Sequence, residues 1–164
     1  MYKHIVVAVD GSNTSLNALQ HAASLAIAGD AKLTLVTVAN PSEYMTLAPE
    51  FLQHESYEAA AIASGNEVLA EAGVAAKAAG VKEVNMHLLV AAKGAKEMAQ
   101  GLVDYADSHG ADLIVIGTHG RTGLMHLLMG SFAETVMRQS HLPLLVIRSV
   151  YREEDDEDEA VAGE

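Results

Sequence analysis

The sequence contains no cysteine and no tryptophan, and only five tyrosines and two phenylalanines. The absence of cysteine excludes disulfide frameworks, thiolate metal sites and cysteine nucleophiles. No apolar run reaches the roughly 18 residues that a membrane-spanning helix requires. The first residues lead directly into a strand-like run at His4 without the pattern of a signal peptide. We therefore expect a cytoplasmic protein that is not embedded in a membrane.

Basic residues are also scarce: ten Lys and Arg stand against 22 Asp and Glu, and the formal net charge is −12. Eight of the acidic residues lie within 153–164, so residues 1–152 carry a charge of only −4. The seven adjacent carboxylates at 153–159 repel one another and bury no apolar area. We expect a disordered acidic tail at 151–164, which is either solubilising or a docking segment. Nucleic acid is not expected as a partner, because binding to the phosphates of a nucleic-acid backbone requires a basic face.

What remains is an aliphatic chain of 164 residues, half of them hydrophobic, which is enough for one domain at 1–150 with a single core. Short apolar runs alternate with long alanine-rich stretches. The runs predict strands at 4–9, 32–38, 84–90, 112–116 and 142–147. The stretches predict helices at 14–28, 55–79, 94–109 and 131–140, the first capped by Ser12 or Asn13. Residues 39–53, which contain two prolines, are expected to be irregular.

Strands that are joined by helices run parallel, with right-handed crossovers that place helices on both faces of the sheet. The pattern therefore predicts an α/β fold with one doubly wound parallel sheet. Ligands bind to such sheets beyond the carboxyl ends of the strands, where the strand order reverses. If the first strand is central, this crevice lies between Asp10, which ends the first strand, and Gly117, which follows the fourth.

A glycine-rich element follows the fourth strand, with Gly117, Gly120, Gly130 and Ser131 spaced as G-x2-G-x9-G-S. Gly117 and Gly120 are expected to adopt positive φ and to let the backbone approach a ligand. The amides and hydroxyl at the start of the last helix are suited to bind a phosphate. Two structural interpretations stay open: Asp10 as a turn residue and Ser131 as a helix cap.

Several other chemistries are disfavoured. The Walker pattern, the dinucleotide pattern G-x-G-x-x-G and the nucleophile elbow G-x-S-x-G are absent. A response regulator would need an aspartate after the third strand, where this chain has Val90-Ala91-Ala92. His119 and His126 span a glycine loop without nearby carboxylates, so we predict no metal site. No catalytic residue is predicted either.

The chain resembles the universal stress protein family, in its ATP-binding subclass. The resemblance covers residues 1 to about 148 and rests on Ile5–Ser12, Asp112–Gly120, the glycine-rich element and Pro143–Ile147. It implies a Rossmann-like five-stranded sheet in the order 3-2-1-4-5. It also implies ATP in the crevice, with any Mg²⁺ held by the phosphates.

The resemblance also assigns the residues that would bind the nucleotide. Ala8 and the backbone of Val38 would line the adenine pocket, and Asp10 and Gly117 would hold the ribose. Gly120, Gly130, Ser131 and the Phe132 amide would cradle the phosphates, with further loop residues nearby. The full expected set is Ala8, Asp10, Val38, Gly117, Thr118, His119, Gly120, Arg121, Gly130, Ser131 and Phe132.

The resemblance, together with the lack of a general base near the γ-phosphate, favours an ATP-binding regulator over an enzyme. A weak ATP hydrolase or an adenylyl-transferring enzyme is the alternative, and a scaffold with an empty pocket is a third. The resemblance implies a homodimer through the edge strand Leu142–Arg148, or a higher oligomer. Some members accompany membrane transporters, including those of salt-tolerant bacteria that take up compatible solutes, so a transporter is one implied partner.

Overall fold

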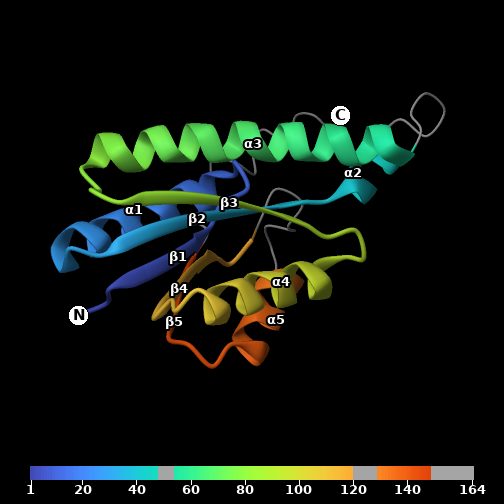
Figure 1. Ribbon diagram of the computed structural model, residues 1–164. Helices are drawn as coiled ribbons and strands as arrows, with labels where there is room; N and C mark the ends of the chain where they lie inside the picture. The colour runs from blue at the N-terminus through green and yellow to red at the C-terminus, as the bar shows by residue number, and fades with distance from the viewer. Residues whose placement is uncertain (48–53, 120–128, 149–164) are drawn as a thin grey trace, which may run out of the picture.

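The computed structural model describes residues 1–47, 54–119 and 129–148. A five-stranded sheet forms the centre of the protein, with the strands in the order β3-β2-β1-β4-β5 and all neighbours parallel (Figure 1). The predicted fold class and strand order are therefore confirmed. The strands are β1 (His4–Ala8), β2 (Lys32–Ala39), β3 (Val84–Val90), β4 (Leu113–Gly117) and β5 (Leu144–Ile147).

Helices cover both faces of the sheet (Figure 1). Helices α1 (Asn13–Gly29) and α3 (His54–Ala79) lie on one face, and α4 (Ala95–Ser108) and α5 (Ser131–Gln139) lie on the other. Successive side chains of a strand point to opposite faces, so Ile5 and Val7 of β1 pack under α1 while Val6 packs under α4. Burial on both faces explains why the central strands are continuous apolar runs.

Part of the segment that we expected to be irregular is a helix, α2 (Pro41–Leu47), so the prediction for 41–47 is wrong. The side-chain oxygen of Asn40 accepts a 3.0 Å hydrogen bond from the amide of Ser42, and Pro41 occupies the first helical position. Both residues are favoured at helix starts, because asparagine caps the first turn and proline lacks the amide that would be unpaired there.

Helix α3 runs without interruption through Gly65, which agrees with the helix predicted at 55–79. A Cβ atom at Gly65 would lie 2.5 Å from Cδ1 of Leu88 on β3. The glycine therefore lets the helix pack closely on the strand. This packing offsets the cost of about 1 kcal/mol that glycine carries relative to alanine within a helix. The helix ends before Gly80, as predicted, and Gly80 has a φ of 108°.

The remaining differences concern element ends. The last strand begins at Leu144 rather than 142, because Leu142 forms a turn in which its amide donates to the Ser140 hydroxyl at 3.1 Å. The expected acidic tail at 151–164 lies outside the described residues. Within the described parts of the chain, no helix is long and apolar enough to span a membrane.

Candidate functional site

A cavity of about 280 Å³ lies at the carboxyl edge of the sheet, where β1 and β4 adjoin and the strand order reverses. Its volume is close to the lower end of the range for small-molecule pockets, roughly 300 Å³. Nine of the eleven residues expected to bind a nucleotide line it, and the other two, Gly120 and Arg121, lie outside the described residues. The nine are Ala8, Asp10, Val38, Gly117, Thr118, His119, Gly130, Ser131 and Phe132.

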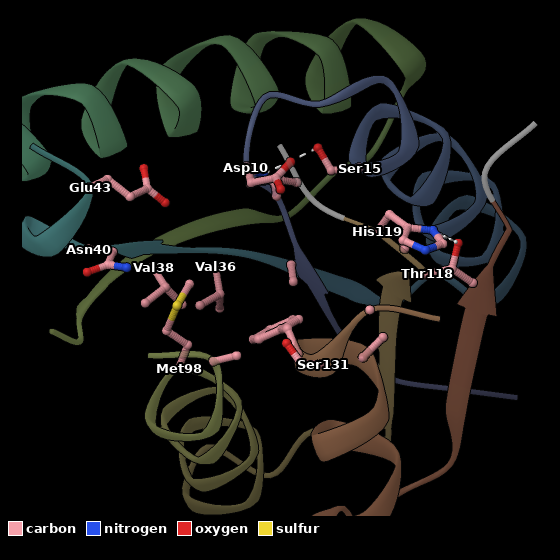
Figure 2. Close-up of a pocket in the computed structure, with 17 residues that line it drawn as sticks. Asp10, Ser15, Val36, Val38, Asn40, Glu43, Met98, Thr118, His119 and Ser131 are labelled. Carbon is pink, nitrogen blue, oxygen red and sulfur yellow. Dashed lines mark hydrogen bonds between the residues drawn. The ribbon is translucent and has the colours of Figure 1, made fainter. Parts of the chain in front are cut away.

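Asp10 lies between β1 and α1 and organises the turn that joins them. One carboxylate oxygen accepts a 2.9 Å hydrogen bond from the amide of Ser12, and the Ser12 hydroxyl caps α1 by accepting from the Ser15 amide at 3.2 Å. The turn role of Asp10 and the capping role of Ser12 are therefore confirmed. The Asp10 side chain also lines the cavity (Figure 2), so the turn does not exclude a ligand contact.

Gly117 ends β4 next to the start of α1. Its φ is not positive, so the expectation of a left-handed conformation is wrong at this residue. A Cβ atom here would lie 2.6 Å from Cγ2 of Thr14. The glycine is thus required by the close approach of α1 to β4, which the sequence alone does not reveal.

Thr118 connects three elements around the cavity. Its amide donates to the Ile147 carbonyl at 2.9 Å and extends the pairing of β4 with β5. Its carbonyl accepts from the Gly130 amide at 2.8 Å, which places the start of α5 beside the end of β4. Its hydroxyl lies 3.1 Å from Nδ1 of His119, and both side chains are buried.

Helix α5 begins at the cavity wall. Its N-cap is Gly130, with an extended backbone and no capping side chain, and Ser131 is the first helical residue. The interpretation of Ser131 as the helix cap is therefore wrong. The first amides of a helix lack partners within the helix, and the helix dipole makes this end positive. Ser131 and this helix end form the part of the cavity that is suited to an anion (Figure 2).

The opposite part of the cavity is apolar, with Val36 and Val38 of β2 and Met98 of α4 in its wall (Figure 2). Two polar side chains, Asn40 and Glu43, stand at its end. The sequence analysis missed both, because they belong to the segment that was expected to be irregular. The signal was present as Asn-Pro-Ser-Glu, in which a capping residue precedes a glutamate by three positions.

Among the described residues that line the cavity, the charged side chains are Asp10 and Glu43, and no Lys or Arg is present. Among these residues, a phosphate at the N-terminus of α5 would therefore contact backbone amides and hydroxyls. The described residues contain no group of three His, Asp or Glu that could hold a metal ion. His126, the second histidine of the pair that we considered, lies outside them.

Comparison with known proteins gives a consistent result. The sequence model of the universal stress protein family matches residues 1–148. A universal stress protein of Methanocaldococcus jannaschii is 35% identical over 153 residues, which cover 93% of this chain and 86% of the relative.

Two solved structures extend the comparison. The crystal structure of a universal stress protein in complex with cAMP is 31% identical, with a TM-score of 0.65 and coverage of 91% of this chain and 98% of that one. The structure of the Archaeoglobus fulgidus universal stress protein in complex with dAMP is 28% identical, with a TM-score of 0.63 and coverage of 89% and 98%. The chain described here belongs to the universal stress protein family.

Proposed function

We propose that the cavity binds an adenine nucleotide, with ATP as the expected ligand, and that the protein acts as a nucleotide-dependent regulator in a stress response. One observation carries the proposal: a single cavity at the reversal of strand order joins an apolar wall to the N-terminus of α5. An apolar wall suits a base, and a helix N-terminus suits a phosphate. The complexes of two similar proteins with cAMP and dAMP support the choice of adenine.

The proposed orientation follows from the two ends of the cavity. The phosphates would lie at Gly130, Ser131 and the Phe132 amide, and the base would lie against Val38. Asp10, which lines the same cavity, would contact the ribose. Gly120 and Arg121 complete the proposed phosphate site on the strength of the resemblance, and Mg²⁺ would be held by the phosphates of ATP.

A regulator is favoured over an enzyme by the contacts and positions of the titratable side chains that line the described part of the cavity. The Asp10 carboxylate holds the turn before α1, and the His119 ring contacts the Thr118 hydroxyl. Glu43 lies at the end remote from α5 (Figure 2), and would not reach the terminal phosphate. These contacts and positions support a regulator over an enzyme, because a general base must lie within hydrogen-bond reach of the water molecule that it activates.

Equilibrium dialysis against ATP, followed by chromatography of the bound nucleotide, tests the proposal. We expect about one ATP per chain, recovered intact after hours of incubation. Conversion to ADP or AMP faster than in the Ser131→Ala variant would favour the alternative of a weak hydrolase or adenylyl-transferring enzyme. Absence of any bound nucleotide would contradict the proposal.

The regulator is also proposed to be a homodimer. Strand β5 lies at one edge of the sheet, and its four apolar side chains are only partly buried. An open apolar edge favours pairing with another chain, and residues Leu142–Arg148 are the proposed contact. The resemblance further implies a membrane transporter as a regulated partner, which co-purification from membranes with and without ATP would test.

A further inference from the structure

We propose that the open edge of β3 binds a second copy of this chain, with the two β3 strands paired antiparallel about a two-fold axis at Leu88. This edge and β5 lie at opposite sides of the sheet, so the contact is separate from the proposed homodimer contact. The two contacts together would join homodimers into larger assemblies. The inference does not depend on the nucleotide site.

Strand β3 lacks the features that usually protect an edge strand. Among the strands of the described residues, its one neighbour is β2. Residues 84–90 contain no Asp, Glu, Lys or Arg, no proline and no glycine. Charges, prolines and bulges are what normally keep an edge from pairing with another chain. The edge also presents two apolar side chains, because Met86 is 50% and Val90 is 46% exposed.

The backbone of β3 determines which of its residues can pair at this edge. The Glu83 carbonyl accepts a 2.9 Å hydrogen bond from the amide of Leu33 on β2. At the other end of the strand, the Ala91 amide donates to the Ala39 carbonyl at 3.0 Å. The odd-numbered residues therefore direct their backbone groups toward β2. The even-numbered residues of 84–90 direct theirs toward the open edge.

A two-fold axis at Leu88 uses these even-numbered residues. It places Leu88 opposite Leu88 of the second copy, and Met86 opposite Val90 of the second copy. Such directly opposite residues exchange both of their backbone hydrogen bonds in an antiparallel pair. Their side chains lie on the same face of the sheet, with Cβ atoms about 5 Å apart. The exposed apolar side chains of the two copies would thus cover each other.

The charges that flank β3 are complementary in the same arrangement. The exposed charged residues are Lys82 and Glu83 before the strand, and Lys93, Lys96 and Glu97 after it. The Lys82 ammonium lies 2.9 Å from the Asp30 carboxylate, so the start of the strand has an excess of negative charge. The end has an excess of positive charge. Glu83 and Lys93 are equally far from Leu88 in the sequence, so the axis brings each to the other residue of the second copy.

Helix α3 supplies a second layer to the contact. It lies over β3 in Figure 1 and contacts β2 and β3 alike, which places its axis about half a strand spacing inside the edge. Because strands lie about 4.8 Å apart, pairing of the two edges brings the two α3 axes to about 10 Å. Helices pack at this distance. The exposed residues of α3 include Ala59, Ala63, Ala70, Val74, Ala75 and Ala78, which are small enough for such an approach.

The contact is small, since it consists of one strand and one side of a helix from each copy. Small interfaces are transient, and we expect a dissociation constant of roughly 100 μM. Homodimers would therefore associate through β3 at high protein concentration. At micromolar concentration this contact would be open.

Disulfide cross-linking tests the register, because the chain has no cysteine of its own. Met86→Cys and Val90→Cys are prepared as separate proteins, mixed at submillimolar concentration and oxidised. We expect a covalent dimer of one chain of each kind, because opposite Cα atoms lie about 5.5 Å apart, within the range of a disulfide. Each variant oxidised alone is the control. Its two cysteines would lie about 13 Å apart along the strands and should not bond.

Charge reversal tests the same axis by a second measurement. Sedimentation equilibrium is carried out from micromolar to millimolar concentration in the Val146→Pro background, which removes the proposed β5 contact. Glu83→Lys should weaken association at least about fivefold, because it places two lysines together at both ends of the contact. Combining it with Lys93→Glu restores opposite charges and should return the affinity to within about twofold of the starting value. Circular dichroism would confirm that each variant is folded.

Three outcomes would overturn the inference. The first is cross-linking of either cysteine variant alone as efficiently as the mixture, and the second is no cross-link at all. The third is a mass that stays at one chain up to millimolar concentration, or a double reversal that associates no better than Glu83→Lys. In these cases the β3 edge does not pair with itself, and an extended segment of another protein would be the remaining occupant. Nucleotide binding is unaffected by any of these results, so the proposed function stands or fails separately.

Discussion

The amide of Gly130 donates a 2.8 Å hydrogen bond to the carbonyl oxygen of Thr118. A Cβ atom at position 130 would lie 3.1 Å from this same oxygen, so the contact favours glycine. The bond joins the residue after β4 to the residue before α5. It fixes the N-terminus of α5 at the carboxyl edge of the sheet, where the phosphates of the proposed ligand would lie.

Replacing Ser131 by alanine separates ligand binding from stability. The side chain is exposed and does not cap α5, so the free energy of unfolding should change by less than about 0.5 kcal/mol. The affinity for ATP should fall about tenfold through loss of a hydroxyl near the phosphates. Chemical denaturation and calorimetry measure the two quantities. Ser24→Ala, on the exposed surface of α1, is the control, and an equal ATP affinity in both variants would argue against the phosphate assignment.

Gly117→Ala should destabilise the fold by about 1–3 kcal/mol, as overpacking does. The added methyl group meets Cγ2 of Thr14, which belongs to a stiff β-branched side chain. Thr14→Ser removes that atom and keeps the hydroxyl, so the double variant should recover most of the lost stability. Urea denaturation of the four proteins gives the coupling free energy. Simply additive effects would show that Thr14 is not the source of the strain.

The stability of the protein should fall on acidification below pH 6.5, in part through His87. Its ring stacks on Tyr105 with centroids 4.1 Å apart, and burial, followed by the nearby His109, lowers the pKa of His87 below its ordinary value of 6.5. The unfolded chain then binds a proton at a pH where the folded protein does not, so acid favours unfolding. His4 contributes in the same direction, because burial lowers its pKa as well.

His87→Phe tests this account, since it keeps a stacked ring and removes the titrating group. Between pH 7.5 and 5.5 the variant should lose less free energy of unfolding than the unmodified protein. His21→Phe, at an exposed position on α1, serves as the control. An identical pH dependence for the unmodified protein and His87→Phe would remove His87 from the explanation.

Val146→Pro should convert the proposed homodimer into a folded monomer. The carbonyls of Pro143 and Ile147 accept hydrogen bonds from Ile114 of β4 and from Thr118, the residue after β4. The backbone groups of the odd-numbered residues of this segment therefore face β4, and the Val146 amide faces the open edge. Proline removes that amide without breaking the pairing with β4. Light scattering at micromolar concentration measures the mass. A monomer before substitution would show that the predicted dimer is wrong.

The strands could be predicted from the sequence because the central strands are buried on both faces, whereas their order came from the family resemblance. Runs such as Ile5–Ala8 are apolar throughout, which is typical of strands that are covered on both faces of a sheet. Topology predicted the crevice on the condition that the first strand is central, and nine of the residues that the resemblance assigned lie around it. The glycine-rich element and Asp10 were thus enough to locate the crevice, and the resemblance supplied the rest of its lining.

Contact between distant segments is one feature that the sequence could not reveal. Gly117 was expected to adopt a positive φ, but it is explained by the close approach of Thr14, and Gly65 within the predicted helix is explained by the close approach of Leu88. Helix α2 was missed for a local reason, because the prolines at 41 and 49 in this part of the sequence outweighed a capping pattern of four residues. The missed helix carries Glu43 and is capped by Asn40, the two polar groups at the end of the cavity that is remote from α5.

The most direct test of the central claim is the nucleotide content of the purified protein. The protein is denatured, and the released small molecules are separated by chromatography and identified by mass spectrometry, before and after incubation with ATP. The account predicts intact ATP at about one molecule per chain, and less than a tenth of that in Gly130→Val. Equal amounts in both proteins, or none in either after incubation, would contradict a nucleotide site at the start of α5.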